Sequence, residues 1–272
     1  MIVALGDNST ENYPSLHKAF ASSQTLPVPH YEDTQNRLAS IHTSSGTTGL
    51  PKGVSLSQLN YISNVYELWS HDPDHWTTNE SVISITPFVH LANEVIPFYL
   101  GPWTGMRHII MASYDLEALG KLVEASKPTT VQMLPPIVKA VVRSDITKRY
   151  DFSSVKRING VYVGLEQHEV ENFGPGKWQT MQMYGLTEVA CWVAMQKILK
   201  KLPVGDIGNL LPGMEARLVT DSGQDAPKGG PGELWLKGTN ITRGYIDNPE
   251  ASKGAFPELG WFNTGDILHH IT

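Results

Sequence analysis

Between residues 56 and 195 short apolar runs alternate with longer helical patterns, and this alternation constrains the fold more than any other feature of the sequence. The short runs predict strands at 81–85, 107–111, 129–134, 157–163 and 178–183. The helical patterns lie at 56–69, 115–126, 135–148 and 166–173. Strands and helices in alternation predict an α/β fold, with a mainly parallel sheet flanked by helices.

The sequence pattern changes after Leu202. Gly and Pro then separate short strand-like segments such as EARLV and GELWLKG, at intervals of about eight to twelve residues. This spacing predicts a β-rich subdomain. We therefore expect an α/β core over 1–200 and a β-rich subdomain over 201–272, with the boundary near 198–206.

Composition limits the classes of partner. The 272-residue chain is 40% apolar and carries a net charge of −6, without a basic patch of the kind that nucleic-acid binding needs. A single cysteine, Cys191, excludes an internal disulfide framework. We expect small-molecule partners and no nucleic acid.

Targeting features are weak in this sequence. No run approaches the roughly 18 apolar residues of a membrane span, and the first residues lack a basic segment before their apolar run. The last three residues are not the Ser-Lys-Leu peroxisomal signal. The expectation is a cytoplasmic protein without a signal peptide or membrane span.

The stretch SSGTTGLPKG, residues 44–53, is too rich in glycine and hydroxyl groups for a core strand or a stable helix. It is therefore expected to be a loop. Accessible backbone N–H groups, four hydroxyls and Lys52 are donors suited to an anion, although the spacing of a Walker A motif is absent. A phosphate-binding loop is favoured over a flexible linker.

Polar residues follow several predicted strands, where ligands of parallel α/β sheets bind. MYGLTEVA places Tyr184, Thr187 and Glu188 after a strand. These groups suit an adenine, a phosphate and a magnesium ion, but an ordinary strand-to-helix turn capped by Thr187 fits as well. Equally, His90 in TPFVHL fits a core histidine, and Asp266 in GWFNTGDI fits an Asx turn.

Taken in order, the motifs HTSSGTTGLPKGV, TPFVHL, MYGLTEVA, GELWLKGTNITRGYIDNPEAS and GWFNTGDI resemble the adenylate-forming superfamily. Its members include acyl-CoA synthetases, peptide-synthetase adenylation domains and beetle luciferases. VGDIGNLLPGMEARLV and the Pro-Phe-x-His pattern look most like the coumarate CoA ligase group. The resemblance implies part of an adenylate-forming N-terminal domain.

The resemblance also implies a role for each motif residue. Lys52, His90, Thr187 and Glu188 would be catalytic, and Glu188 would hold Mg²⁺. The ATP-binding set would comprise Thr43, Ser44, Ser45, Gly46, Thr47, Thr48, Gly49, Lys52, Tyr184, Gly185, Thr187 and Asp266. Within it, Tyr184 would stack on adenine, Thr187 would contact the α-phosphate and Asp266 would accept the ribose hydroxyls.

An acyl pocket is implied as well. Its wall would comprise His90, Met133, Leu134, Val161 and Val163. Relatives show a small-residue stretch resembling Gly-Ala-Ala-Pro-Leu near the last two positions, where this chain reads NGVYVGLEQ. The bulkier side chains imply a narrower pocket or a shifted alignment.

The implied activity is ATP-dependent activation of an aryl or fatty carboxylic acid as an acyl adenylate, for transfer to CoA or a related thiol. A partner enzyme of a biosynthetic pathway is possible. Members of the family carry a catalytic lysine in a C-terminal domain that follows the Thr-Gly-Asp motif, and we expect that domain to be absent here, because six residues follow Asp266. The expectation is therefore an impaired ligase. The alternatives are a nucleotide-binding remnant or scaffold, and a peptide-synthetase adenylation module.

Overall fold

The computed structural model describes residues 30, 32–33, 35–44, 51–160, 178–197 and 205–269. Residues 34–272 form one compact unit and residues 1–33 another. All described helices and strands belong to the larger unit. Within the described residues, no helix is both long and apolar enough to cross a membrane.

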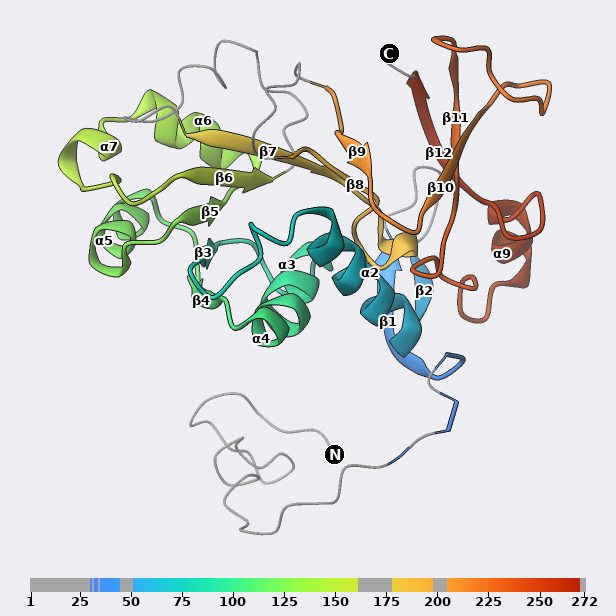
Figure 1. The fold of residues 1–272 in the computed structure, drawn as a ribbon, viewed down its shortest axis with the longest axis horizontal. Helices are drawn as coiled ribbons and strands as arrows, with labels where there is room; N and C mark the ends of the chain where they lie inside the picture. The colour runs from blue at the N-terminus through green and yellow to red at the C-terminus, as the bar shows by residue number, and fades with distance from the viewer. Residues whose placement is uncertain are drawn as a thin grey trace. The chain divides into compact units, whose positions relative to one another are not determined.

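A seven-stranded sheet organises the larger unit, with the strand order β4-β3-β5-β6-β7-β8-β9 (Figure 1). The first five strands in this order are parallel, whereas β8 and β9 continue the sheet in antiparallel pairing. The strands are β3 (Ser81–Ser84), β4 (Arg107–Ile110), β5 (Thr130–Gln132), β6 (Arg157–Gly160), β7 (Gln179–Tyr184), β8 (Ala194–Met195) and β9 (Asn209–Leu210). The predicted parallel sheet is thus confirmed.

Three helices cover one face of this sheet: α5 (Leu116–Ser126), α6 (Pro135–Arg143) and α7 (Ile146–Arg149). Their apolar residues pack with Ile83, Val131 and Ile158 of the strands in one core. The single helix predicted over 135–148 is wrong. Ser144 adopts an extended conformation with ψ 171°, so the chain leaves α6 and starts the separate helix α7 two residues later.

Helices of the opposite face come from two segments. The first is α2 (Gln58–His71), capped by Ser57, whose hydroxyl accepts from the Asn60 N–H. The second runs without a break through α3 (Ala92–Glu94), a π-helical turn η1 (Val95–Leu100) and α4 (Gly101–Thr104). A second core joins these helices to the sheet residues Val82 and Met181.

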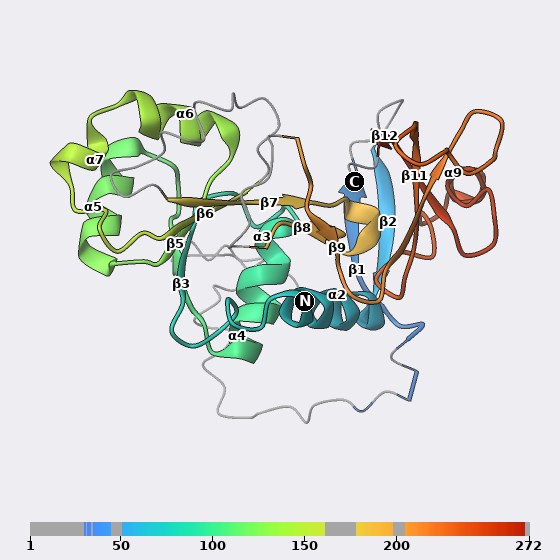
Figure 2. The ribbon, with the colours of Figure 1, turned by 45° about the horizontal axis from the view of Figure 1, so that its top comes forward.

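A β-hairpin lies between the seven-stranded sheet and the C-terminal strands (Figure 2). It pairs β1 (Leu38–Ser44) with β2 (Lys52–Ser57). The expectation of a loop throughout residues 44–53 is therefore wrong at both ends. Ser44 pairs with Lys52 and Thr43 with Gly53, because the ladder satisfies their backbone groups, and residues 45–50 lie outside the described residues.

The C-terminal strands form a three-stranded antiparallel sheet in the order β10-β11-β12. They are β10 (Glu215–Val219), β11 (Pro231–Lys237) and β12 (Phe262–His269), and helix α9 (Pro249–Ala255) precedes the last strand. This sheet confirms the β-rich subdomain. The predicted boundary falls mainly on 198–204, and the predicted helix on 166–173, and both lie outside the described residues.

Candidate functional site

A cavity of about 470 Å³ opens where the hairpin, the end of β7 and the C-terminal sheet meet. The side chains around it come from segments far apart in the sequence. Its lining comprises Ser44, Lys52, Gly185, Leu186, Thr187, Glu188, Tyr245, Ala251, Gly254, Ala255, Phe262, Asn263, Thr264, Gly265 and Asp266. We refer to it as the first cavity.

Five residues of the predicted ATP-binding set line the first cavity: Ser44, Lys52, Gly185, Thr187 and Asp266. Glu188, the predicted Mg²⁺ ligand, lines it too, whereas Thr43 of the set does not. Ser45, Gly46, Thr47, Thr48 and Gly49 lie outside the described residues. Among the described lining residues Lys52 is the one basic side chain, so an anion bound here would meet its charge.

Tyr184 does not line the first cavity but bonds to a residue that does. Its hydroxyl, at the end of β7, donates to Asp266 Oδ2 over 2.5 Å. Burial, followed by this carboxylate, raises the pKa of Tyr184 far above its ordinary value, so the phenol stays protonated. The second carboxylate oxygen of Asp266 remains available to accept hydrogen bonds from a ligand.

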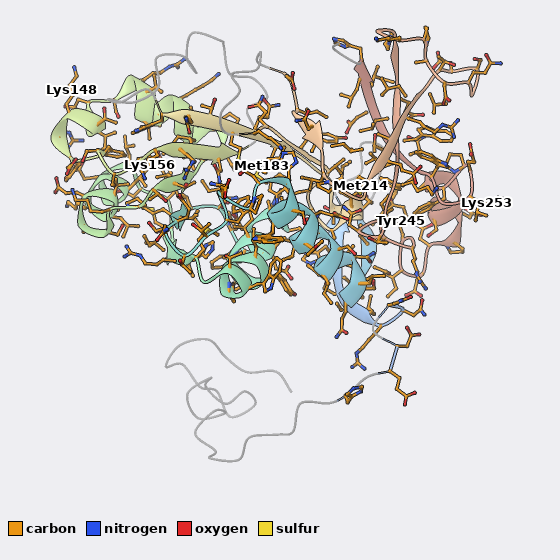
Figure 3. The ribbon with its side chains drawn as sticks, viewed as in Figure 1. Lys148, Lys156, Met183, Met214, Tyr245 and Lys253 are labelled. Carbon is orange, nitrogen blue, oxygen red and sulfur yellow. The ribbon has the colours of Figure 1, made fainter. Side chains whose placement is uncertain are left out.

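Tyr245 contacts two other residues that line the first cavity. The Tyr245 hydroxyl donates to Glu188 Oε1 over 3.0 Å, and Lys52 Nζ lies 5.0 Å from the Tyr245 ring centroid. Tyr245, labelled in Figure 3, lies beside the hairpin because Val54 pairs with it and Ile246 N–H donates to the Gly53 carbonyl. We made no prediction for Tyr245, although it lies in the motif GELWLKGTNITRGYIDNPEAS.

The carboxylates of the first cavity suit a Mg²⁺ ion only if a ligand supplies further oxygen atoms. No cluster of three or more metal-binding side chains occurs among the described residues. Glu188 is buried to 7% exposure and lines the first cavity. Because Mg²⁺ in nucleotide sites takes one or two carboxylates together with phosphate oxygens and water, a single carboxylate in this position suits it.

The turn after β7 is not capped by Thr187. A short 3₁₀ helix, η2 (Thr187–Val189), begins at Thr187 itself, and no side chain caps it. The structure therefore does not support the alternative in which this hydroxyl serves only as a helix cap. The side chain of Thr187 instead lines both the first cavity and a second one.

The second cavity has a volume of about 410 Å³ and reaches across the carboxyl ends of the parallel strands. Its lining comprises Thr86, Pro87, His90, Leu91, Ala92, Gln132, Met133, Leu134, Pro135, Gly160, Gly185, Leu186, Thr187, Cys191 and Trp192. Three of the predicted pocket residues, His90, Met133 and Leu134, are among them. Val161 and Val163 lie outside the described residues.

His90 is exposed at the mouth of the second cavity, which contradicts the alternative of a buried core histidine. Its Nδ1 atom accepts from the Ala92 N–H over 3.3 Å. In the neutral ring this leaves the proton on Nε2, where it can be donated to a ligand.

Gly185, Leu186 and Thr187 line both cavities and form their shared wall. A Cβ atom on Gly185 would lie 1.6 Å from the Cys191 carbonyl oxygen, so glycine alone allows this close approach. Cys191 itself has φ 108°, an uncommon angle for a residue with a side chain. The wall is therefore a tightly constrained turn.

The fold and the two joined cavities define an α/β protein with a polar and a largely apolar ligand site at one end of a parallel sheet. The family model of the AMP-binding enzymes matches residues 2–246. The chain therefore belongs to the AMP-binding enzyme family, and the resemblance seen in its motifs is confirmed.

Sequence relatives lie in the coumarate CoA ligase group, as the motifs predicted. The chain is 30% identical over 275 residues to 4-coumarate–CoA ligase 5 of Oryza sativa subsp. japonica. This alignment covers 98% of this chain and 51% of the ligase. The chain is 29% identical to 4-coumarate–CoA ligase 1 of Arabidopsis thaliana, with coverage of 98% and 50%. The chain spans about half the length of these relatives.

Solved structures of adenylate-forming enzymes share the fold. Apo MatB from Rhodopseudomonas palustris matches with a TM-score of 0.79 at 24% identity, over 92% of this chain and 48% of that one. The O-succinylbenzoate coenzyme A synthetase of Bacillus subtilis, in complex with ATP and a magnesium ion, matches with a TM-score of 0.74 at 20% identity, over 86% and 48%.

Proposed function

We propose that this chain provides the ATP- and acid-binding part of an acid–thiol ligase, which activates a carboxylic acid as an acyl adenylate for transfer to CoA. One observation carries the proposal. The polar first cavity and the largely apolar second cavity meet at the wall formed by Gly185, Leu186 and Thr187. An acid in the second cavity can therefore present its carboxylate to a phosphate in the first.

The first cavity would take MgATP. Lys52 and residues 44–49 would bind the outer phosphates, Thr187 the α-phosphate, and Asp266 the ribose hydroxyls. Stacking of the adenine on the Tyr184 ring stays a prediction, because Tyr184 meets this cavity only through its hydrogen bond to Asp266. Mg²⁺ at Glu188 would neutralise phosphate charge. The related synthetase in complex with ATP and a magnesium ion supports this use of the cavity.

The second cavity would take the acid. His90 Nε2 would donate to its carboxylate and so orient it toward the α-phosphorus. Attack by a carboxylate oxygen forms the acyl adenylate and releases pyrophosphate, and a thiol then displaces AMP. The names of the related coumarate ligases favour CoA as this thiol and aryl acids among the substrates.

The lining of the second cavity also bears on the peptide-synthetase alternative. Its described residues include no carboxylate that could bind an amino group. Glu94, the acidic residue four positions after His90, is instead engaged by His42 over 3.0 Å and by the Tyr61 hydroxyl over 3.2 Å. We therefore favour an acid without an amino group. The impaired ligase stays a prediction.

Calorimetry of ATP and AMP with the Lys52→Ala variant tests the proposal. ATP binding should weaken at least about tenfold, while AMP binding changes little, because the lost cation faces the outer phosphates. Lys148→Ala, which removes an exposed lysine of α7 (Figure 3), is the control and should bind both nucleotides normally. An equal loss for ATP and AMP would contradict this placement of Lys52.

A further inference from the structure

A cluster of polar side chains connects the hairpin to the helices that cover one face of the parallel sheet. Nε2 of His42 on β1 lies 3.0 Å from Glu94 Oε2 and 2.9 Å from the Tyr61 hydroxyl. This hydroxyl, on α2, donates to Glu94 Oε1 over 3.2 Å and lies 2.7 Å from Ser40 Oγ. Tyr61 is 2% exposed, and the side chains of His42 and Glu94 are 14% and 19% exposed. The cluster therefore lies mostly inside the protein.

Glu94 is the acceptor that the other members of this cluster share. The Tyr99 hydroxyl also donates to Glu94 Oε1, over 3.4 Å, and the Tyr99 ring stacks on the Tyr61 ring with 4.7 Å between the centroids. Burial raises the pKa of Tyr61 above its ordinary value and the Glu94 carboxylate adds to this, so the phenol stays protonated and remains a donor. Because hydrogen bonds to a carboxylate are stronger than those between neutral groups, these donors fix the position of Glu94.

The two sides of the cluster lead to the two cavities. Residues two apart on a strand point to the same face, so His42 shares a face of β1 with Ser44, which lines the first cavity. Glu94 is the last residue of α3, and Ala92 at the start of this helix lines the second cavity together with His90. The contact between His42 and Glu94 is therefore a connection between the cavities that does not pass through the shared wall.

The segment that carries His90 uses Glu94 to contact other elements. Helix α3 starts two residues after His90, and no side chain caps this start. The side chains of His90 and Asn93 bond to Ala92 and Thr86 of the same segment. Glu94 instead bonds to β1 and α2. Its carboxylate therefore provides a polar contact between this segment and the hairpin.

We propose that the contact between His42 and Glu94 couples the two cavities, so that a nucleotide in the first raises the affinity of the second for a carboxylic acid. A phosphate bound at Ser44 restrains β1, and His42 and Glu94 transmit this restraint to the segment of His90. The acid then meets a segment that has already lost part of its freedom, and so it binds more tightly. His42 and Glu94 are thus positioning residues. The inference rests on the proposed function, because it takes the cavities as the nucleotide and acid sites.

Calorimetry on the whole chain measures this coupling. The coupling ratio is the dissociation constant of an acid alone, divided by its dissociation constant with saturating α,β-methylene-ATP. This analogue has a carbon atom between the α- and β-phosphates, so pyrophosphate cannot leave and the acid does not react. Cinnamic, benzoic and decanoic acids serve as probes. The wild-type protein should show a ratio of about five or more, as coupled sites typically do.

Three variants separate coupling from a loss of stability, and urea unfolding checks that each is folded. His42→Leu removes the ring donor and should lower the ratio to about one. His42→Gln offers an amide N–H in place of the Nε2 donor and should restore most of the ratio. Ile41→Ala, at a half-exposed neighbour on the other face of β1, is the matched control and should keep the wild-type ratio. A destabilised but folded variant would bind each ligand more weakly without lowering the ratio.

An unchanged ratio in a folded His42→Leu protein would overturn the inference and leave the proposed function standing. A wild-type ratio near one, with both ligands bound, would do the same. If the analogue and all three acids failed to bind, the proposed function and this inference would be overturned together.

Discussion

Single residues connect the two cavities, and Gly185 shows the tightest constraint. Tyr184 before it bonds to Asp266, and Thr187 after it lines both cavities. The backbone at Gly185 passes so close to Cys191 that no side chain fits between them. Because the atom in the way belongs to the backbone, a rotamer change of a neighbour cannot relieve the clash.

Gly185→Ala should therefore lower the free energy of unfolding by about 1–3 kcal/mol or more and weaken binding at both cavities. Gly254→Ala is the matched control. Gly254 also lines the first cavity, but a Cβ there meets nothing within 4 Å, so this variant should keep its stability. Urea unfolding measures both variants. Equal stability of the two would show that the turn can relax.

Among the elements, α2 anchors the segment that connects the shared wall to β8. Asn64 of this helix donates to the Trp192 carbonyl over 2.7 Å and accepts from its N–H over 3.2 Å. The same Asn64 amide donates to Glu67 Oε2 over 3.3 Å. Burial of Glu67 outweighs this hydrogen bond and raises its carboxyl pKa from 4.5 to about 7.

This pKa shift predicts how stability depends on pH. The folded protein holds the Glu67 proton more tightly than the unfolded chain, so the stabilisation is present below pH 4.5 and is lost as the pH rises through about 7. Glu67→Gln removes this loss. Its unfolding free energy, compared with the wild type, should gain up to about 3 kcal/mol between pH 5 and 8.

Urea unfolding across this pH range measures the difference between the two proteins. His75 and His108, whose pKa values burial lowers to about 3 and about 4, are present in both and cancel from it. Glu250→Gln changes an exposed carboxylate of α9 and should show no such trend. A pH-independent difference between Glu67→Gln and the wild type would refute the assignment.

Over the whole molecule, a hairpin, a parallel sheet and an antiparallel sheet contribute to two cavities that share one wall. A ligand that fills both cavities gains the contacts of each, but it loses its translational and rotational freedom only once. Under the proposed function, we therefore expect a joined acyl-nucleotide to bind more tightly than its separate halves.

An acyl sulfamoyl adenosine, a stable analogue of an acyl adenylate, should bind about a hundredfold or more tightly than AMP or the free acid. Calorimetry with all three ligands measures this gain. The adenosine sulfamate without its acyl group controls for the linker. If the joined ligand bound no better than AMP, the two cavities would not form one continuous site.

The alternating pattern of the sequence was sufficient to predict the parallel strands. The run at 81–85 is apolar and short, and its strand β3 is largely buried within the sheet, as the pattern predicted. The run at 107–111 forms the edge strand β4, which is only partly buried.

The motifs contained six residues that line the first cavity, and three of these, Gly185, Thr187 and Glu188, follow the parallel strand β7, where ligands of such sheets bind. Ser44 and Lys52 come instead from the hairpin, and Asp266 comes from the antiparallel strand β12.

Tertiary contacts decided the rest. The strand at Leu38–Ser44 is half exposed and lacks a clear apolar pattern, so only its pairing with β2 makes it a strand. Tyr245 bonds to Glu188 because its segment pairs with Gly53 and Val54 of the hairpin. Tyr245 and Val54 are nearly two hundred positions apart in the sequence. Local sequence therefore determined the parallel strands, whereas chain packing determined the hairpin strand and which distant side chains meet.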